Sequence, residues 1–544
     1  MESFTKLKRR GTDLISSLPH NLPSMPHLPN LQRRAAGART MKGTWQHVSI
    51  PALPRSSHSV DVVAGNAYIF GGEVEPRQPV DNDMHVVVLP SLSAPADYYA
   101  IKARPSPTQQ QHEASSASIS EDDETEEAQL QDPLSEVPLT SPPPPPVAAK
   151  SPSSDKGKSQ DVNLEVPSSR LGHATAVIGS RIFLFGGRTA AAETIEEKGR
   201  VWVFETKRHT WSHLDPHRTS PVPPSRSYFA AVATDKPRDF AIKPLRRAST
   251  WKDWAEGDSA EVGIPQRPIA GNVAAYATDE EDAGFGTFII HGGCLADGSR
   301  TADVWAFDVR SCVWKELPAA PGAARGGAAL ALAKSRLYRF GGYNGQAEEG
   351  GQLDVLDLAL DEFDDRVSRG EIGVFARGEW QTLAAPVTAA PPPNAEETAK
   401  LVPSEDWPGP RSVSGFELVL GGGGREYLIL ALGERSPSAD GHAGAGGFWD
   451  DVWAFQVPPI GMTAASVTDA FLHAVGRKTG EGKWTRVAPA PFDDESALDA
   501  QGPGPRGWLA SAPLGDLEEN ALVVFGGLNE KNQRLGDGWI FRLE

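Results

Sequence analysis

The chain has 544 residues, of which 71 are acidic and 53 basic, and a formal net charge of −18. Nucleic acid is therefore not an expected partner, because no general positive field attracts the phosphates. The two cysteines, Cys294 and Cys312, have no paired-thiol spacing; this argues against a disulfide framework or a cysteine zinc site and is compatible with a reducing compartment. No apolar run approaches the roughly 18 residues of a membrane span, and no secretory signal is recognisable, so we expect a cytoplasmic protein without a membrane span.

The first 43 residues are predicted to form a disordered basic tail. Residues 1–40 carry seven basic side chains against Glu2 and Asp13. Prolines at positions 23, 26 and 29 would interrupt any amphipathic helix, which favours disorder. A segment that contacts an acidic membrane, or a transit peptide, is the alternative interpretation.

One pattern then occurs six times. An arginine precedes an apolar strand, a second apolar strand ends in a glycine pair, and a third strand combines aspartate with aromatic residues. The arginines that begin the units are Arg55, Arg170, Arg226, Arg325, Arg411 and Arg506. In the fifth unit Leu432 replaces the first glycine, and in four units a fourth strand carries a tryptophan. Short β-type runs separated by glycine turns predict four-stranded sheets, and such units repeated radially make a propeller.

The two ends of the repeat region are predicted to pair. The sixth unit ends after its third strand at Glu544, whereas residues 44–50, which include Trp45, form an isolated strand before the first unit. We expect this N-terminal strand to complete the sixth blade, because closure leaves no open sheet edge. Residues 44–544 are thus predicted to form one all-β, six-bladed propeller that is a monomer.

Two long insertions interrupt the repeats. Successive arginines are 56 to 115 residues apart, against a repeat length of about 50 residues. Residues 104–168 include EDDETEE and five consecutive prolines, which predicts a disordered acidic insertion. Residues 237–283 are expected to be a loop insertion in the third blade.

The six arginines are expected on one face of the propeller. Because strands alternate in direction, the connections between blades emerge on the same face as the loops after each second strand. Those loops contain Glu73, Arg188 and Glu434. A ring of guanidinium groups would bind carboxylate, sulfate or phosphate. In the alternative interpretation each arginine is structural and is hydrogen-bonded to a neighbouring blade.

The arginine, the glycine pair and the trailing tryptophan together resemble the kelch repeat. RSSHS and YIFGGEVEPRQPVDND in the first unit, and GHAGAG in the fifth, are similar to the nitrile-specifier and thiocyanate-forming subgroup of kelch proteins. That resemblance implies a six-bladed propeller that acts on glucosinolate-type or related sulfated metabolites with Fe(II), and it maps substrate-binding arginines to Arg55, Arg170 and Arg226.

The same resemblance implies an iron site in the fifth unit at Glu434, Asp440 and His442. The subgroup has the pattern E-x3-D-x3-H, but position 438 of this chain is serine and the nearest carboxylate is Asp440. One histidine with two carboxylates suits Fe(II). A polar hairpin tip is the alternative interpretation. Kelch copper oxidases are a poorer comparison, because no matching set of copper ligands is recognisable.

Two functions therefore remain. The first is a binding module in which the six arginines and Glu73 hold an anionic small molecule or an acidic protein segment. The second is an Fe(II)-dependent, nitrile-specifier-like protein. The sequence leaves open whether the protein is an enzyme.

Overall fold

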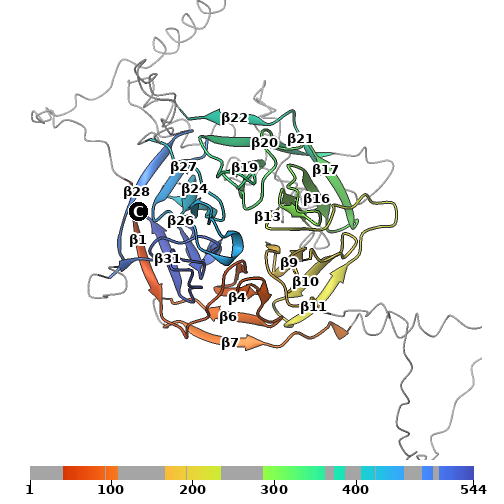
Figure 1. The fold of residues 1–544 in the computed structure, drawn as a ribbon, viewed down its shortest axis with the longest axis horizontal. Helices are drawn as coiled ribbons and strands as arrows, with labels where there is room; N and C mark the ends of the chain where they lie inside the picture. Colours follow the sequence, from red (N-terminus) through yellow and green to blue (C-terminus); the bar gives the residue numbers. More distant parts are fainter. Residues whose placement is uncertain are drawn as a thin grey trace, which may run out of the picture. The chain divides into compact units, whose positions relative to one another are not determined.

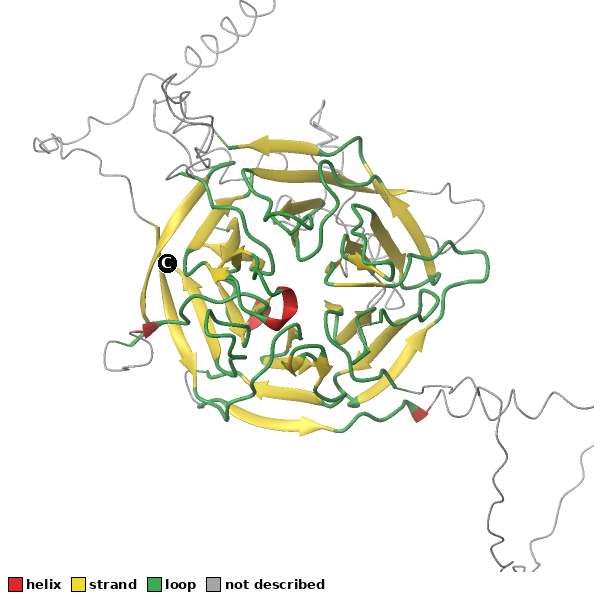
Figure 2. Ribbon diagram, viewed as in Figure 1, coloured by secondary structure: helices red, strands yellow, loops and turns green. Residues whose placement is uncertain are grey.

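Six blades surround a central axis in the computed structural model (Figure 1); blade four has five described strands and each of the others has four. The structure describes residues 41–91, 94–107, 166–191, 193–234, 286–361, 373–385, 406–422, 424–458, 481–493 and 501–544. Most of the two predicted insertions and the first 40 residues of the predicted tail lie outside these ranges. Strands and loops dominate (Figure 2), and no helix in the described ranges is long and apolar enough to cross a membrane.

In each of the first three blades the strands pair antiparallel from the axis outwards. Blade one contains β2 (Ser59–Val63), β3 (Asn66–Phe70), β6 (Met84–Val88) and β7 (Asp97–Ile101). Blade two contains β8 (Ala174–Ile178), β9 (Arg181–Phe185), β10 (Val201–Glu205) and β11 (Thr210–Leu214). Blade three contains β13 (Ala230–Thr234), β14 (Thr287–His291), β16 (Val304–Asp308) and β17 (Val313–Leu317).

The other three blades follow the same plan. Blade four contains β18 (Ala329–Ala333), β19 (Arg336–Phe340) and β20 (Gln352–Asp361), and β20 pairs with both β21 (Gly373–Ala376) and β22 (Gln381–Ala384). Blade five contains β23 (Gly415–Gly421), β24 (Arg425–Ala431), β27 (Val452–Gln456) and β28 (Trp484–Pro491). Blade six contains β29 (Ala510–Pro513), β30 (Ala521–Phe525), β31 (Gly538–Leu543) and the N-terminal strand β1 (Met41–Val48).

Strand β1 closes the propeller, as predicted. It pairs antiparallel with β31, with Trp45 opposite Phe541. It also pairs in parallel with β28, with Trp45 opposite Pro491, so blades five and six form one eight-stranded sheet. The repeat pattern did not predict this second pairing, because it lies between the outer strands of two different blades.

Apolar side chains fill the spaces between neighbouring blades. The tryptophan of an outer strand packs against a phenylalanine of the preceding blade: Trp211 against Phe70 at 5.2 Å, and Trp314 against Phe185 at 5.3 Å between ring centroids. Both tryptophans are fully buried. Buried aromatic rings contribute large apolar areas, so the predicted bulk between adjacent blades is confirmed for these tryptophans.

A closed ring of backbone hydrogen bonds surrounds the axis. The residue two positions after each arginine donates its N–H to the equivalent carbonyl of the preceding blade, over 2.7–3.1 Å. All six have φ between 45° and 62°, the left-handed region that glycine adopts most easily. The six residues are Ser57, Gly172, Tyr228, Gly327, Val413 and Trp508. Val413 and Trp508 adopt this left-handed conformation despite its steric cost. The hydrogen bonds of the ring therefore compensate for backbone strain at these residues.

A second set of interblade bonds explains the glycine pairs. The N–H of the second glycine donates to the carbonyl of the next blade's arginine over 2.8–3.0 Å in all six blades. The first glycine passes the same carbonyl closely: a Cβ on Gly71 would lie 2.4 Å from the Arg170 carbonyl oxygen. Leu432 occupies the first position in blade five with φ of 60°.

The six motif arginines are buried, which contradicts the prediction of an open anion-binding ring. Their exposed fractions are 0–3%. Each donates through Nη1 to the carbonyl that precedes the second glycine of its own blade, over 2.9–3.2 Å. An unpaired buried charge is costly, so these guanidinium groups face internal partners. The structural interpretation of the motif arginines is therefore the one supported.

Most of these arginines also pair with an acid that precedes the third strand. Ion pairs of 2.6–2.8 Å join Arg170 to Glu197, Arg226 to Asp303, Arg411 to Asp451 and Arg506 to Asp537. In each case the indole N–H of a third-strand tryptophan donates to the same carboxylate: Trp202, Trp305, Trp453 and Trp539, over 2.6–2.8 Å. The aspartate and aromatic residues of the repeat thus satisfy its buried arginine.

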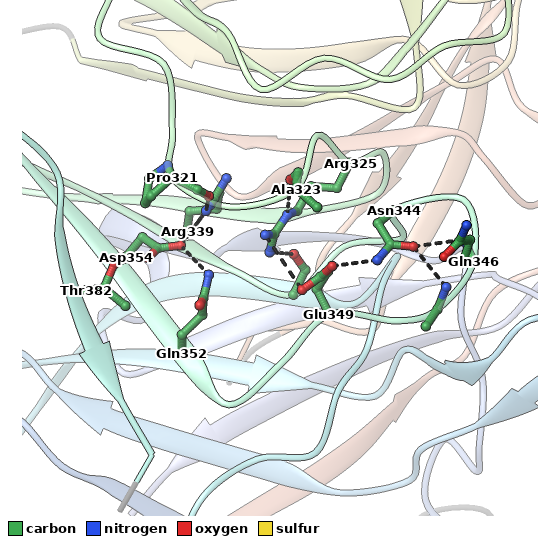
Figure 3. A network of polar contacts seen from close by, with 12 residues as sticks. Pro321, Ala323, Arg325, Arg339, Asn344, Gln346, Glu349, Gln352, Asp354 and Thr382 are labelled. Carbon is green, nitrogen blue, oxygen red and sulfur yellow. Dashed lines mark hydrogen bonds and ion pairs between the residues drawn. The ribbon is translucent and has the colours of Figure 1, made fainter.

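Blade four satisfies its arginines differently (Figure 3). Arg325 lies 3.8 Å from Glu349, and no tryptophan stands in its third strand. A second buried arginine, Arg339, instead bonds Asp354 at 3.0 Å, and the Thr382 hydroxyl donates to the same aspartate at 2.7 Å. Asp354 lies opposite Arg339. In blade four a carboxylate therefore stands where blades two, three, five and six have the third-strand tryptophan.

Removing β1 should open the propeller. Deleting residues 1–52 should lower the free energy of unfolding by at least about 4 kcal/mol, the cost of losing a buried tryptophan alone, because Trp45 and both strand pairings disappear. Deleting residues 1–40 removes no described contact and should leave the free energy unchanged. Denaturant unfolding of the two truncated proteins checks this, and equal destabilisation would show that β1 does not close the ring.

Removing an acid from one arginine pair should be destabilising. Asp303→Ala leaves Arg226 fully buried without its ion pair, so the free energy of unfolding should fall by about 3–5 kcal/mol. Asp297→Ala is the matched control, because Asp297 lies exposed in the same blade. Chemical denaturation compares them, and similar values for both variants would mean that the pair contributes little.

Candidate functional site

A cavity of about 240 Å³ lies on the axis at the arginine end of the blades. Its lining includes four residues of the backbone ring: Tyr228, Gly327, Val413 and Trp508. The loops that follow the second strands supply the charged lining residues, so the predicted convergence of these loops is confirmed for Glu73 and Glu434. Short strand pairs begin two of these loops, β4 (Glu73–Glu75) with β5 (Gln78–Pro79), and β25 (Glu434–Ser436) with β26 (Gly447–Phe448).

Three glutamates lie on the cavity in different states. Glu73 is well bonded: its carboxylate accepts from the Arg77 N–H at 2.6 Å and pairs with Arg534 at 3.3 Å. Glu434 is 6% exposed and accepts from the Trp508 indole N–H at 3.0 Å, and burial raises its pKa to about 7.

The third glutamate, Glu348, lacks hydrogen-bond partners. Burial raises its pKa to about 8, and repulsion from Glu434 adds to the shift. The Ser412 side chain offsets part of this effect, but without hydrogen-bond geometry to either buried carboxylate oxygen. A buried polar group without a partner costs roughly 1–3 kcal/mol, so Glu348 is placed to receive one.

Two arginines other than the motif arginines line the cavity. Arg534 pairs with Glu73, but its buried Nε has no partner. Arg300 stacks over the Tyr343 ring at 4.9 Å, and its Nε is also buried without a partner. No carboxylate of the described residues forms an ion pair with Arg300. A third arginine, Arg188, stacks over Tyr228 at 6.0 Å.

The predicted iron ligands are not brought together by the described side chains. Glu434 lies on the cavity and is bonded to Trp508, whereas Asp440 is exposed and precedes the short 3-10 helix η3 (Gly441–Ala443). His442 lies in η3, and its side chain is outside the described part. Within that part, no group of three His, Cys, Asp or Glu side chains could hold a metal ion.

Sequence reasoning missed Arg300, Glu348 and Arg534. All three lie a few residues beyond a glycine pair, in LADGSR, YNGQAEE and LNEKNQR. Loops at the face where blades converge are the usual positions of binding residues, so a charged residue at this distance was an available signal. The direction of such a side chain could not be predicted from the sequence, because it depends on the conformation of the folded loop.

Comparison with known proteins agrees with the repeat. A family model for the Kelch motif matches residues 169–217. The N-(sulfonatooxy)prop-2-enimidothioate sulfolyase of Thlaspi arvense is 44% identical over 54 residues, which cover 9% of this chain and only 15% of that protein. The solved structure of YjhT is similar over 90% of this chain and 95% of its own, with 12% identity and a TM-score of 0.42. The six repeats of the propeller and the motif match in the second blade support a kelch-repeat protein.

Proposed function

We propose that the axial cavity binds a small anionic molecule. The observation that carries this proposal is Arg300: its Nε is buried without a partner, the residue lines the axial cavity, and no described carboxylate forms an ion pair with it. A buried donor atom without a partner is unfavourable, and a guanidinium group forms strong bidentate bonds with carboxylate, sulfate or phosphate. We therefore assign the anion-binding role to the cavity arginines Arg300 and Arg534 instead of the motif arginines.

The acidic side chains of the cavity favour the same ligand charge near neutral pH. Burial raises the pKa of Glu348 to about 8 and that of Glu434 to about 7, so at pH 6 both are largely neutral. Protonation of Glu348 and Glu434 removes two negative charges beside Arg300 and Arg534, which makes the cavity more favourable for an anion. Above pH 8 both glutamates ionise, and the cavity becomes unfavourable for anions.

The size of the cavity favours a small molecule over an acidic protein segment, because a volume of about 240 Å³ accommodates only a compact compound. The Thlaspi arvense relative is named as a sulfolyase of a sulfonatooxy compound, and such a compound is also an anion.

Sulfate is a suitable probe, because its charge is constant over the pH range of interest. Arg300→Met should weaken sulfate binding at pH 6 by at least about tenfold, the value of one charge-assisted hydrogen bond. Raising the pH from 6 to 9 should weaken binding to the parent protein by a similar factor, since both glutamates lose their protons. Isothermal titration calorimetry measures both effects.

Arg218→Met is the matched control, because Arg218 is exposed on blade two and does not line the cavity. It should bind sulfate as the parent does. Sulfate binding that is absent from the parent, or equal in the parent and Arg300→Met, would refute the proposal.

An Fe(II)-dependent, specifier-like activity is the second candidate. The short similarity to the sulfolyase and the loop with Glu434, Asp440 and His442 favour it. The described side chains do not fit an iron site, because Glu434 is committed to Trp508 and Asp440 is exposed, so no catalytic step is derived from it.

An anaerobic Fe(II) titration decides whether this loop binds iron. If the second candidate holds, the parent should bind one Fe(II), and His442→Ala should bind it at least about tenfold more weakly. Equal binding by both proteins, or none by the parent, would exclude iron at this loop. The sulfate titration is unaffected by either result.

A further inference from the structure

We infer that the cavity selects a small hydroxy-carboxylate, with the carboxylate bound by Arg300 and the adjacent hydroxyl bound by Glu348. This inference rests on the proposed function and names its ligand class. The two residues come from neighbouring blades, three and four, and line one cavity. Each has buried polar atoms without partners: Nε of Arg300 and both carboxylate oxygens of Glu348.

Arg300 is held in a fixed orientation without being neutralised. Its guanidinium group lies 4.9 Å from the Tyr343 ring centroid, and the Tyr343 hydroxyl donates to the Gly345 carbonyl at 2.9 Å. The loop passes closely: a Cβ on Gly345 would lie 2.7 Å from Nη1 of Arg300. Stacking fixes the plane of a guanidinium group and leaves its edge available for a carboxylate.

The loop that contains Glu348 is held by hydrogen bonds of Asn344 and Glu349 (Figure 3). The Asn344 amide donates to the Glu349 carboxylate at 2.6 Å, and its oxygen accepts from the N–H groups of Gln346 and Ala347 at 2.8 and 2.9 Å. Glu349 also forms the ion pair with Arg325. Glu349 therefore anchors the loop to blade four, whereas the adjacent Glu348 lines the cavity.

The protonation state of Glu348 selects the second group of the ligand. Because burial raises its pKa to about 8, Glu348 is mostly neutral at pH 7 and attracts an ammonium group weakly. A hydroxyl both donates and accepts, so it satisfies a carboxylic acid. A simple carboxylate would satisfy Arg300 but leave Glu348 buried without a partner, at a cost in affinity.

The test compares lactate with propanoate, which differ by one hydroxyl, and includes alanine as the ammonium analogue. Binding to the full chain at pH 7 is measured by ligand-observed NMR. The parent should bind lactate about tenfold more tightly than propanoate. Glu348→Met should bind both equally, at the parent's affinity for propanoate, and Arg300→Met should bind neither.

Glu348→Met should fold, because it replaces a buried carboxyl without partners by an apolar side chain of similar length. Glu193→Met is the control, since Glu193 is exposed on blade two, and it should retain the preference for lactate. Equal binding of lactate and propanoate by the parent, or tighter binding of alanine, would overturn this inference while sulfate binding leaves the proposed function intact. If sulfate, lactate and propanoate all fail to bind, the proposed function itself fails.

Discussion

The ring of six interblade hydrogen bonds at the axis is the constraint on which the rest of the propeller depends. Each bond requires a residue in the left-handed region two positions after an arginine. That geometry brings the arginine carbonyl to the glycine pair of the preceding blade, where only a residue without a crowding Cβ is easily accommodated. The repeated arginine and glycine residues therefore provide the hydrogen bonds that join each blade to the next, and these bonds fix the spacing of the blades.

The propeller contains two kinds of arginine with buried donor atoms. The motif arginines have internal acceptors, and in blades two, three, five and six an acid and a tryptophan complete the arrangement. Arg300 and Arg534 line the axial cavity and have Nε atoms without partners. Structural arginines have hydrogen-bond acceptors within the protein, whereas the proposed binding arginines have a buried donor without one. This difference, rather than the number of arginines, distinguishes the two roles.

The fold was predictable because its determinants are repeated. Arginine, glycine pair and tryptophan recur at similar positions, so the number of blades and the closing role of Trp45 follow from the pattern. The parallel pairing of β1 with β28 did not follow, since it depends on how two outer strands meet. Arg55 and its counterparts lie just before the innermost strands, close to where they were predicted, but they are buried, because spacing does not reveal burial. Glu73 and Glu434 were correctly expected at the axial face, whereas Glu348 belongs to a loop whose direction depends on Asn344 and Glu349.

The position of β1 between β31 and β28 affects how the protein folds during synthesis. Strand β1 leaves the ribosome among the first parts of the described chain, yet its antiparallel partner, Gly538–Leu543, leaves last. The apolar side of β1, with Trp45, thus remains uncovered while nearly the whole propeller is translated. Such long-range pairing slows folding and leaves an aggregation-prone strand edge exposed during synthesis. We therefore expect folding of this protein to depend on chaperones, although each blade is a simple antiparallel sheet.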